Sequence, residues 1–452
     1  HPHTPSRQPG ERGGVGGRSG AAWIYRYAHP GLLQQGYVPR LRGARRSVPR
    51  CRARTNTALI AENTQSELKP VVHARGPQVG DQWLLYAVTV VVALGVLLVL
   101  DTSYAWAAVV NDSGRSYALR QAVYAVVGFL GLAVMLRTDY RRLRNISGTL
   151  LILVLVALCA VWLPFIGHSE GGAARWINLR FTKVQPSELA KIALVLYLAR
   201  FFTDRHYSVA HRPHLFAPLL VLGLVCGLIE REPDLGTAIV VMMGGLSVFF
   251  AAGVRLRRLV VVVGALACVG LLVVAGGGYR GGRISVFLNP ENDPKHIGLQ
   301  AQRSGLAIGS GMLTGMGLGK GREKYYIPAA NTDYIFATYA EETGFLGSVL
   351  LVGLYMLIAQ RGFAIALRCS DGFGRLLAVG ISTIISGQAA LNLMVTTSLL
   401  PSTGVPLPLV SSGGSSLVSV LVSVGILLSI AHRNPAPVVQ KLHGQPVSRG
   451  SA

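Results

Sequence analysis

Ten apolar runs, each roughly 20 residues long, recur after Trp83 and constrain the fold more than any other feature of the chain. An α-helix needs about 20 apolar residues to cross the hydrocarbon core of a bilayer. The pattern therefore predicts an all-α integral membrane protein with about ten transmembrane helices. The runs lie at residues 83–101, 117–136, 147–167, 186–203, 214–229, 235–254, 258–275, 339–360, 374–400 and 413–432.

The composition favours a membrane protein over a series of soluble domains. Of the 452 residues, 51% are hydrophobic and only 14% are charged, whereas soluble domains are usually about 25% charged. The net charge of +23 does not indicate nucleic-acid binding, because the basic residues concentrate near the N-terminus and in short loops between apolar runs. The five cysteines lack metal-ligand spacing, so we expect neither a disulfide framework nor a zinc site.

Arginine-rich loops orient the predicted helices. The loops after the second, fourth, sixth and eighth runs each hold three or four Arg, and the short loops on the other side hold few. The positive-inside rule then places both termini in the cytoplasm. Residues 276–338 become a long extracytoplasmic loop between helices 7 and 8, with a short surface helix expected at residues 299–308.

The two ends of the chain differ from the predicted membrane domain at residues 81–433. Residues 1–80 are rich in Gly and Arg and lack apolar periodicity, which predicts a disordered, basic cytoplasmic tail. A start assigned too far upstream, a processing remnant or an organelle transit peptide are alternative origins for this segment. Residues 434–452 are expected to form a short cytoplasmic tail.

Scarce charged residues stand out within or beside the apolar runs. Glu188 and Lys191 share one face of a predicted helix, and such intramembrane ions are either functional or a self-neutralising pair. Asp333 precedes the eighth run, where it is either a catalytic carboxylate or an acid favoured by the helix dipole. Glu341 and Glu342 lie deeper, so we expect them to serve helix packing or coupling to the preceding loop.

Three further segments are distinctive. The acids Glu230, Glu232 and Asp234 fall at a tight turn, where solvated loop acids are the simplest expectation. The glycine-rich "GMGLGKGREK" lacks the spacing of a Walker A phosphate loop. The segment "LLPSTGVPLPLVSSGGSSLV" contains three prolines, so its irregular backbone must find polar partners in protein or in a watery cavity.

Several ordered motifs resemble the SEDS family (shape, elongation, division and sporulation), whose members include FtsW and RodA. They are "YALRQAVYAVVG", "DYRRLR", "RWINL", "VQPSELAK", "EPDLGT", "FLNPENDP", "GMGLGKG", "IPAANTDYIFATYAEETGFLG" and "GVPLPLVSSGGSSL". The resemblance spans nearly the whole membrane portion and omits the first 80 residues. It implies a peptidoglycan glycosyltransferase of the bacterial cytoplasmic membrane, with its active site on the extracytoplasmic face.

The resemblance also implies substrates and partners. A member of this family polymerises lipid II into glycan strands, using an undecaprenyl-linked growing chain, and works with a class B penicillin-binding protein and other division or elongation proteins. Because undecaprenyl pyrophosphate leaves as an anion, we expect basic residues or a divalent metal ion, Mg or Mn, to stabilise it. No organic cofactor and no nucleic acid are expected.

The family motifs assign roles to individual residues. Asp333 corresponds to the essential aspartate and is the expected catalytic base. The resemblance also carries substrate binding onto Trp176, Glu188 and Lys191. The chemistry of the leaving group makes Lys191, Arg175, Lys320 and Arg322 the candidates to hold the pyrophosphate. Gln300 and Ser416 complete the expected substrate-binding residues.

Some residues depart from the family pattern and leave alternatives open. Asn331 stands where His is usual, Arg303 replaces a Gln, and "SSGG" replaces "SYGG". "GREKYYIP" and "GGSSL" favour the FtsW-like division branch over the RodA-like elongation branch. A lipid II flippase and a non-catalytic divisome scaffold are the rival classes.

Overall fold

The computed structural model describes most of the predicted membrane domain. Residues 1–78 and 435–452, which make up nearly all of the tails predicted at 1–80 and 434–452, lie outside the described residues, as do short parts of the loops. The described residues are 79–110, 115–163, 167–170, 173–178, 183–204, 215–275, 279–289, 293 and 297–434.

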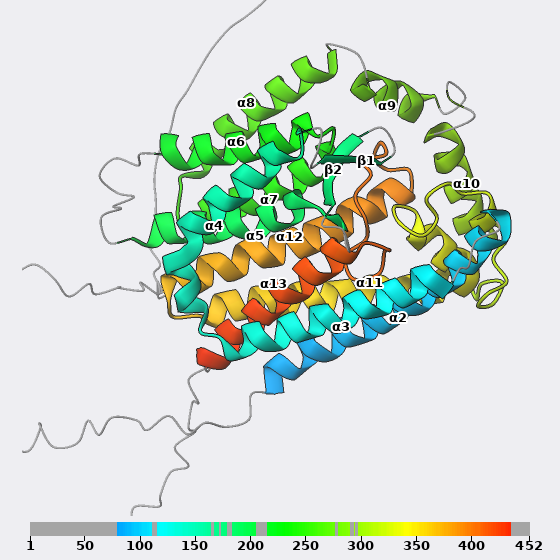
Figure 1. Cartoon of the computed structure of the whole chain (residues 1–452), viewed down its shortest axis with the longest axis horizontal. Coiled ribbons are helices and arrows are strands. Elements are labelled where there is room, and N and C mark those ends of the chain that lie inside the picture. Colours follow the sequence, from blue (N-terminus) through cyan, green and yellow to red (C-terminus); the bar gives the residue numbers. More distant parts are fainter. Residues whose placement is uncertain are drawn as a thin grey trace, which may run out of the picture. The chain divides into compact units, whose positions relative to one another are not determined.

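Each of the ten predicted apolar runs corresponds to a helix in the described part of the chain (Figure 1). In a bilayer a backbone must satisfy its own hydrogen bonds, and a helix does so within one segment. The helices are α2 (Val79–Val110), α3 (Arg115–Arg137), α4 (Tyr140–Ala160), α5 (Pro186–Thr203), α6 (Phe216–Arg231), α7 (Leu235–Ala251), α8 (Leu256–Ala275), α11 (Ile335–Arg368), α12 (Gly372–Thr396) and α13 (Gly414–Arg433).

By length and composition, six of the described helices could cross a membrane: α2, α3, α4, α11, α12 and α13. The chain is thus a multi-pass membrane protein. Helices α12 and α13 are mostly buried, whereas α3 and α4 bury only a minority of their residues. α12 packs against α5, α7 and α11, and α13 packs against α3, so α12 and α13 form the centre of the helical core.

Aspartates fix the starts of several helices. Asp139 caps α4 by accepting a hydrogen bond from the Arg141 N–H at 2.9 Å, and Asp371 caps α12 through the Gly374 N–H at 3.0 Å. Such caps satisfy backbone donors that have no partner inside the helix. The cap at Asp139 also explains why α4 covers residues 140–160 and not the predicted 147–167.

The expectation of an all-α protein is wrong between α4 and α5. Three short antiparallel strands lie there in the order β1 (Gly167–Glu170), β2 (Ala173–Asn178) and β3 (Lys183–Val184). His168 of β1 pairs with Trp176 of β2, next to a register shift. This segment is too polar to continue as a spanning helix, and strand pairing satisfies its backbone instead.

The predicted loop at 276–338 contains its own short helices. They are α9 (Tyr279–Leu288), α10 (Ile297–Ser310) and the 3₁₀ turn η2 (Glu323–Tyr325). α10 confirms the helix predicted near residues 299–308, and the Ser304 hydroxyl anchors it by donating to the Thr396 carbonyl of α12 at 2.7 Å.

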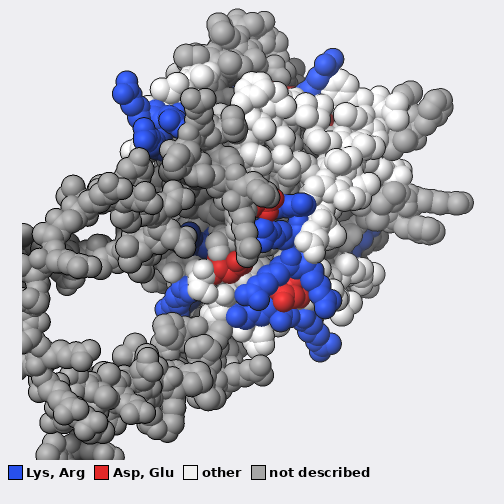
Figure 2. Space-filling model, turned by 90° about the vertical axis from the view of Figure 1, so that its left-hand side faces the viewer, with Lys and Arg blue, Asp and Glu red and all other residues white. Residues whose placement is uncertain are grey.

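Basic side chains gather at one end of the helical core (Figure 2). The connections at this end follow α3, α5, α7 and α11, and α13 also finishes there. Some of the charges are paired: Arg144 contacts Asp204 at 2.7 Å, and Arg433 lies 3.9 Å from Asp139. The strands, α9, α10 and the loop before α11 lie at the opposite end (Figure 1).

α11 is broken at Gly344, where the chain adopts φ 69° and ψ −163°. The break frees backbone groups for the preceding loop. The Glu341 and Glu342 carbonyls accept from the Met316 and Gly317 N–H groups, each at 3.0 Å. These two carbonyls of α11 are therefore satisfied by N–H groups of the loop and not by N–H groups of the helix.

Replacing Gly344 with alanine is expected to destabilise the protein by about 1–3 kcal/mol from backbone strain alone. The new Cβ would also lie 2.3 Å from the Gly315 nitrogen, which no small shift relieves. Gly353→Ala on the same helix is the matched control, since nothing lies within 4 Å of its Cβ position. Thermal unfolding in detergent measures both, and equal melting temperatures would contradict the account.

Candidate active site

Asp333 lies in the turn immediately before α11 and is half-buried. The residue that caps α11 is Tyr334, and no side chain makes a capping hydrogen bond there. Asp333 is held through its backbone, because the Asn392 side-chain amide donates to its carbonyl at 2.8 Å. Its carboxylate is thus not used to cap the helix.

Two guanidinium groups act on the Asp333 carboxylate. Burial raises the pKa of Asp333 from 3.8 to about 6, while the charges of Arg283 on α9 and Arg175 on β2 oppose the rise. Burial disfavours the ionised carboxylate because protein atoms replace water around it. The result is a carboxylate that is ionised at neutral pH yet basic enough to accept a proton.

Gly404 lies near both the Asp333 carboxylate and the Arg283 guanidinium. A Cβ at Gly404 would lie 3.7 Å from Asp333 Oδ2 and 4.0 Å from Arg283 Nη2. Arg283 is fixed to the same loop, since its Nη1 donates to the Ser402 carbonyl at 2.7 Å. The segment 402–404 therefore positions Arg283 close to Asp333.

The turn between α6 and α7 holds Arg175. Arg175 Nε donates to the Glu232 carbonyl at 3.0 Å, and its Nη2 donates to the Pro233 carbonyl. Asp234 caps α7 through the Thr237 N–H at 3.1 Å and also accepts from Gln185 Nε2 at 3.1 Å.

The expectation of solvated acids at this turn is wrong for Glu232 and Asp234, which are both buried. Burial, together with the nearby charge of Asp234, raises the pKa of Glu232 to about 8. Glu232 is therefore mostly neutral at pH 7, which removes one negative charge from the surroundings of Arg175.

The proline-rich segment between α12 and α13 finds the polar partners that its sequence requires. Ser411 Oγ donates to the Thr332 carbonyl at 2.5 Å, and the Ser412 N–H donates to the Asn331 carbonyl at 2.8 Å. The Tyr355 hydroxyl donates to the Pro408 carbonyl. Residues 397–413 thus form the wall against which the Asp333 turn packs.

The polar pair on α5 is buried and satisfied by protein groups. Lys191 Nζ lies 2.7 Å from Glu188 Oε2, and both side chains are 3% exposed. Lys191 also donates to Gln388 of α12, and Glu188 accepts from Ser419 of α13, each at 2.8 Å. This geometry agrees with the self-neutralising alternative and links three helices of the core.

The other predicted binding residues are spread around the same end of the protein. Trp176 is half-buried on β2, and Gln300 is half-buried on α10. Lys320 and Arg322 have exposed side chains in the loop before α11. Ser416 is buried in the first turn of α13, and its hydroxyl has no hydrogen-bond partner among the described residues. Of the predicted basic residues, Arg175 carries a charge that lowers the pKa of Asp333.

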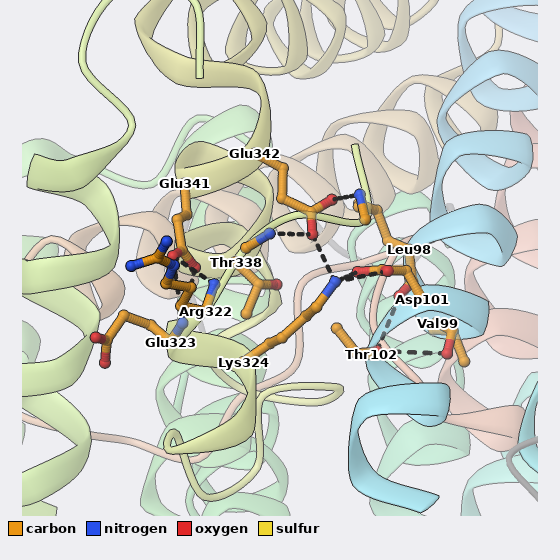
Figure 3. Close-up of polar contacts among 12 residues, drawn as sticks. Leu98, Val99, Asp101, Thr102, Arg322, Glu323, Lys324, Thr338, Glu341 and Glu342 are labelled. Atoms are coloured by element: carbon orange, nitrogen blue, oxygen red, sulfur yellow. Dashed lines mark hydrogen bonds and ion pairs between the residues drawn. The ribbon is translucent and has the colours of Figure 1, made fainter. Parts of the chain in front are cut away.

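Glu341 and Glu342 hold the loop before α11, which confirms their predicted coupling to it (Figure 3). Glu342 accepts from the Gly319 and Gly321 N–H groups at 3.0 and 3.2 Å, and Glu341 accepts from the Arg322 N–H at 2.7 Å. Both glutamates point away from α11 into this loop (Figure 3).

Lys324 ties the same loop to α2. Its Nζ lies 2.7 Å from both carboxylate oxygens of Asp101 and 2.8 Å from Glu342 (Figure 3). The hydrogen bonds to Asp101 and Glu342 raise the pKa of Lys324 against the effect of burial. Lys324, Asp101 and Glu342 thus form one charge network that joins the loop to α2 and α11.

Sequence reasoning missed Arg283, Asn392 and the Asp101–Lys324 pair. A signal existed for Asp101, which is an acid at the end of an apolar run in a chain with only 20 acids. Nothing in the sequence near Arg283 or Asn392 indicates that they meet Asp333. Arg303, which stands where the family usually has Gln, has local partners for its charge. It lies 3.3 Å from Glu323 and packs over the Tyr326 ring.

Most of the chain matches the model of a known protein family. The family model described as "Cell cycle protein", which joins FtsW, RodA and SpoVE, matches residues 81–435. The chain belongs to the FtsW/RodA/SpoVE family. The matched region coincides with the membrane domain that contains Asp333 and excludes the N-terminal segment.

Individual members of the FtsW/RodA/SpoVE family resemble the chain over most of their own length. A probable peptidoglycan glycosyltransferase FtsW of Trichlorobacter lovleyi is 38% identical over 357 residues, covering 78% of this chain and 93% of the relative. The stage V sporulation protein E of Bacillus subtilis is 35% identical over 357 residues, covering 78% and 96%.

Solved structures of the family share the fold. A chain from work on "structural coordination of polymerization and crosslinking by a peptidoglycan synthase complex" is 32% identical with a TM-score of 0.64, covering 77% of this chain and 96% of that one. The rod-shape-determining protein RodA of Thermus thermophilus is 31% identical with a TM-score of 0.57, covering 77% and 95%.

Proposed function

We propose that this protein is a peptidoglycan glycosyltransferase that polymerises lipid II. The observation that carries the proposal is the Asp333 carboxylate beside Arg283, with Arg175 acting on the same group. The relatives named peptidoglycan glycosyltransferase FtsW support the reaction class. They also favour septal synthesis during cell division over the elongation role of RodA.

In the proposed reaction Asp333 is the general base. It accepts the proton of the 4-hydroxyl of the N-acetylglucosamine on lipid II as that oxygen attacks C1 of the lipid-linked N-acetylmuramic acid. The bond from C1 to the pyrophosphate oxygen breaks, so an α-linked donor gives a β-1,4 product by a single inversion. A base of pKa about 6 suits this step at neutral pH.

The leaving group needs positive charge, not a proton. Undecaprenyl pyrophosphate departs as an anion, unlike the sugar alkoxide released by a glycosidase. Arg175 and Arg283 are placed to stabilise it, because guanidinium groups bind phosphate oxygens through paired N–H donors. Arg175 is one of the four predicted pyrophosphate candidates, with Lys191, Lys320 and Arg322, and we add Arg283 to them.

The described residues around Asp333 do not form a protein cage for a metal. No group of three or more His, Cys, Asp or Glu side chains that could hold a metal ion lies in the described part of the chain. A Mg²⁺ or Mn²⁺ ion enters the proposal only as one carried by the pyrophosphate, since Mg²⁺ sites often use substrate phosphates with one or two carboxylates. No step above depends on it.

The basic end of the core supports the proposed orientation. Arg-rich connections at one end and Asp333 at the other suit a cytoplasmic basic end and an extracytoplasmic active site. All ten long helices then span the bacterial cytoplasmic membrane, with both termini in the cytoplasm. The sugars react at the outer surface while the lipid tails remain in the bilayer.

A class B penicillin-binding protein, which is a transpeptidase, is the proposed partner. The similar solved chain belongs to work on a peptidoglycan synthase complex that coordinates polymerisation with crosslinking. The decisive experiment incubates the purified protein with lipid II, with and without that partner, and separates glycan strands on a gel. Glycan product supports the proposal. Lipid II flipping in vesicles without any polymer would favour the transporter alternative, and neither activity would favour a scaffold.

The pH dependence of polymerisation is expected to report Asp333. Since only the ionised carboxylate accepts a proton, kcat/KM should fall below an apparent pKa of about 6, not about 4. Arg283→Gln should move this acid limb upward, because the Arg283 charge lowers the Asp333 pKa. Arg257→Gln, an exposed residue at the basic end, is the control. An acid limb near pH 4 would contradict the raised pKa of Asp333.

A further inference from the structure

Asn392 of α12 lies where the catalytic turn meets the proline-rich segment. It is 1% exposed, and its Nδ2 donates to the Asp333 carbonyl and to the Val405 carbonyl, each at 2.8 Å. Because both partners are acceptors, the amide must present its NH₂ group to them. One side chain thus joins two backbone segments that are 72 residues apart in the sequence.

These two segments carry the groups whose spacing matters for the reaction. Val405 follows Gly404, which lies against both Asp333 Oδ2 and Arg283 Nη2. Arg283 is bound to the Ser402 carbonyl of the same segment at 2.7 Å. The position of Arg283 relative to Asp333 therefore depends on the junction that Asn392 makes.

A second buried amide supports this junction one turn earlier on α12. Gln388 is also 1% exposed; its Nε2 donates to the Pro406 carbonyl at 2.9 Å and its Oε1 accepts from Lys191 at 2.8 Å. α12 thus presents two amides, at i and i+4 on one face, to consecutive carbonyls of the proline-rich segment. Pro406 and Pro408 have no N–H group, so fewer backbone donors hold this stretch and the α12 amides help to define its position.

We propose that Asn392 is a positioning residue, which sets the distance between the Asp333 carboxylate and the Arg283 guanidinium by clamping the Asp333 turn to residues 402–405. This inference rests on the proposed glycosyltransferase function. Asn392 touches no reacting atom, so its loss is expected to lower kcat more than it raises KM. A misplacement of about 1 Å can cost about 100-fold in rate.

A loosened clamp should also alter proton affinity at the site. The charged groups that act on Asp333 are Arg283, Arg175 and Asp234. Arg283 lowers the Asp333 pKa, so its withdrawal raises that pKa, while Arg175 and Asp234 are held by the separate turn at 232–237. The acid limb of kcat/KM should therefore move upward in an Asn392 variant.

The test compares Asn392→Leu, which keeps volume but removes both donors, with Asn392→Ser, which keeps one hydroxyl donor. Thr396→Val is the matched control, because Thr396 is buried one turn further on and, among the described residues, its hydroxyl donates to carbonyls of α12 alone. Lipid II polymerisation is measured from pH 4.5 to 8.5 alongside thermal unfolding. Asp333→Asn is included in the same assay.

We expect kcat to fall about 100-fold in Asn392→Leu and less in Asn392→Ser, with an upward shift of the acid limb in both and no change in Thr396→Val. If Asn392→Leu does not fold, the kcat and the acid limb of Asn392→Ser test the inference. Folded variants with the wild-type kcat, or with a lower kcat but an unmoved acid limb, overturn the inference. An active Asp333→Asn would instead overturn the proposed function, so the two failures are distinguishable.

Discussion

Asp333→Asn is expected to lower lipid II polymerisation by about 10²–10⁴-fold, the usual contribution of general acid–base catalysis. Asparagine keeps the shape and the backbone bond from Asn392, but its amide cannot accept the proton of the attacking hydroxyl. The measurement is the rate of glycan formation by the purified variant, with thermal unfolding recorded on the same sample.

The same variant separates catalysis from folding. Asp333 makes no capping bond for α11, and burial disfavours its charged form, so its neutral replacement should leave the melting temperature unchanged or slightly higher. Near-normal glycan product from a folded Asp333→Asn protein would remove Asp333 as the base. A loss of folding in this variant would show that its main role is structural.

Lys191→Met is expected to destabilise the protein by about 3–5 kcal/mol, the usual cost of leaving a buried charge without its partner. Among the described residues the Glu188 carboxylate would keep the Ser419 hydroxyl at 2.8 Å as its hydrogen-bond partner, and its side chain is only 3% exposed. Gln388 would also lose the group that its Oε1 now binds. Thermal unfolding in detergent checks the expectation.

The double variant Glu188→Gln with Lys191→Met is the matched control. It removes both charges, and replacing a buried ion pair as a whole is often close to neutral for stability. Its melting temperature should therefore lie well above that of Lys191→Met. A single variant as stable as the wild type would contradict the account.

The double variant also decides between the two hypotheses for this pair. If it is stable and polymerises lipid II, the pair serves the fold alone. If it is stable but inactive, one of the two charges contributes to substrate binding or catalysis, as the family resemblance predicts for Glu188 and Lys191.

The described helices agree well with the apolar pattern, and the physical reason is the bilayer. A spanning segment must satisfy its backbone locally, so the sequence of each run suffices to predict its helix. The failures lie where that reason no longer applies. The polar segment between α4 and α5 forms three strands, because a backbone outside the bilayer core can satisfy its hydrogen bonds through pairing partners elsewhere in the chain.

Individual site residues divide in the same way. Asp333, Glu341 and Glu342 could be singled out because carboxylates are scarce in this chain and rarely border apolar runs. The expected coupling of the two glutamates to the loop is confirmed by their bonds to its N–H groups. The burial of Glu232 could not be predicted from the sequence, because it depends on elements that pack over the turn.

The sequence by itself determined the membrane class, the helical segments, the family and the candidate base, since each depends on local composition or on ordered motifs. Only the tertiary structure decided which groups surround that base. Arg283 comes from α9, Arg175 from β2 and Asn392 from α12. Their meeting depends on the packing of elements far apart in the sequence, and the charge and proton affinity of Asp333 follow from that packing.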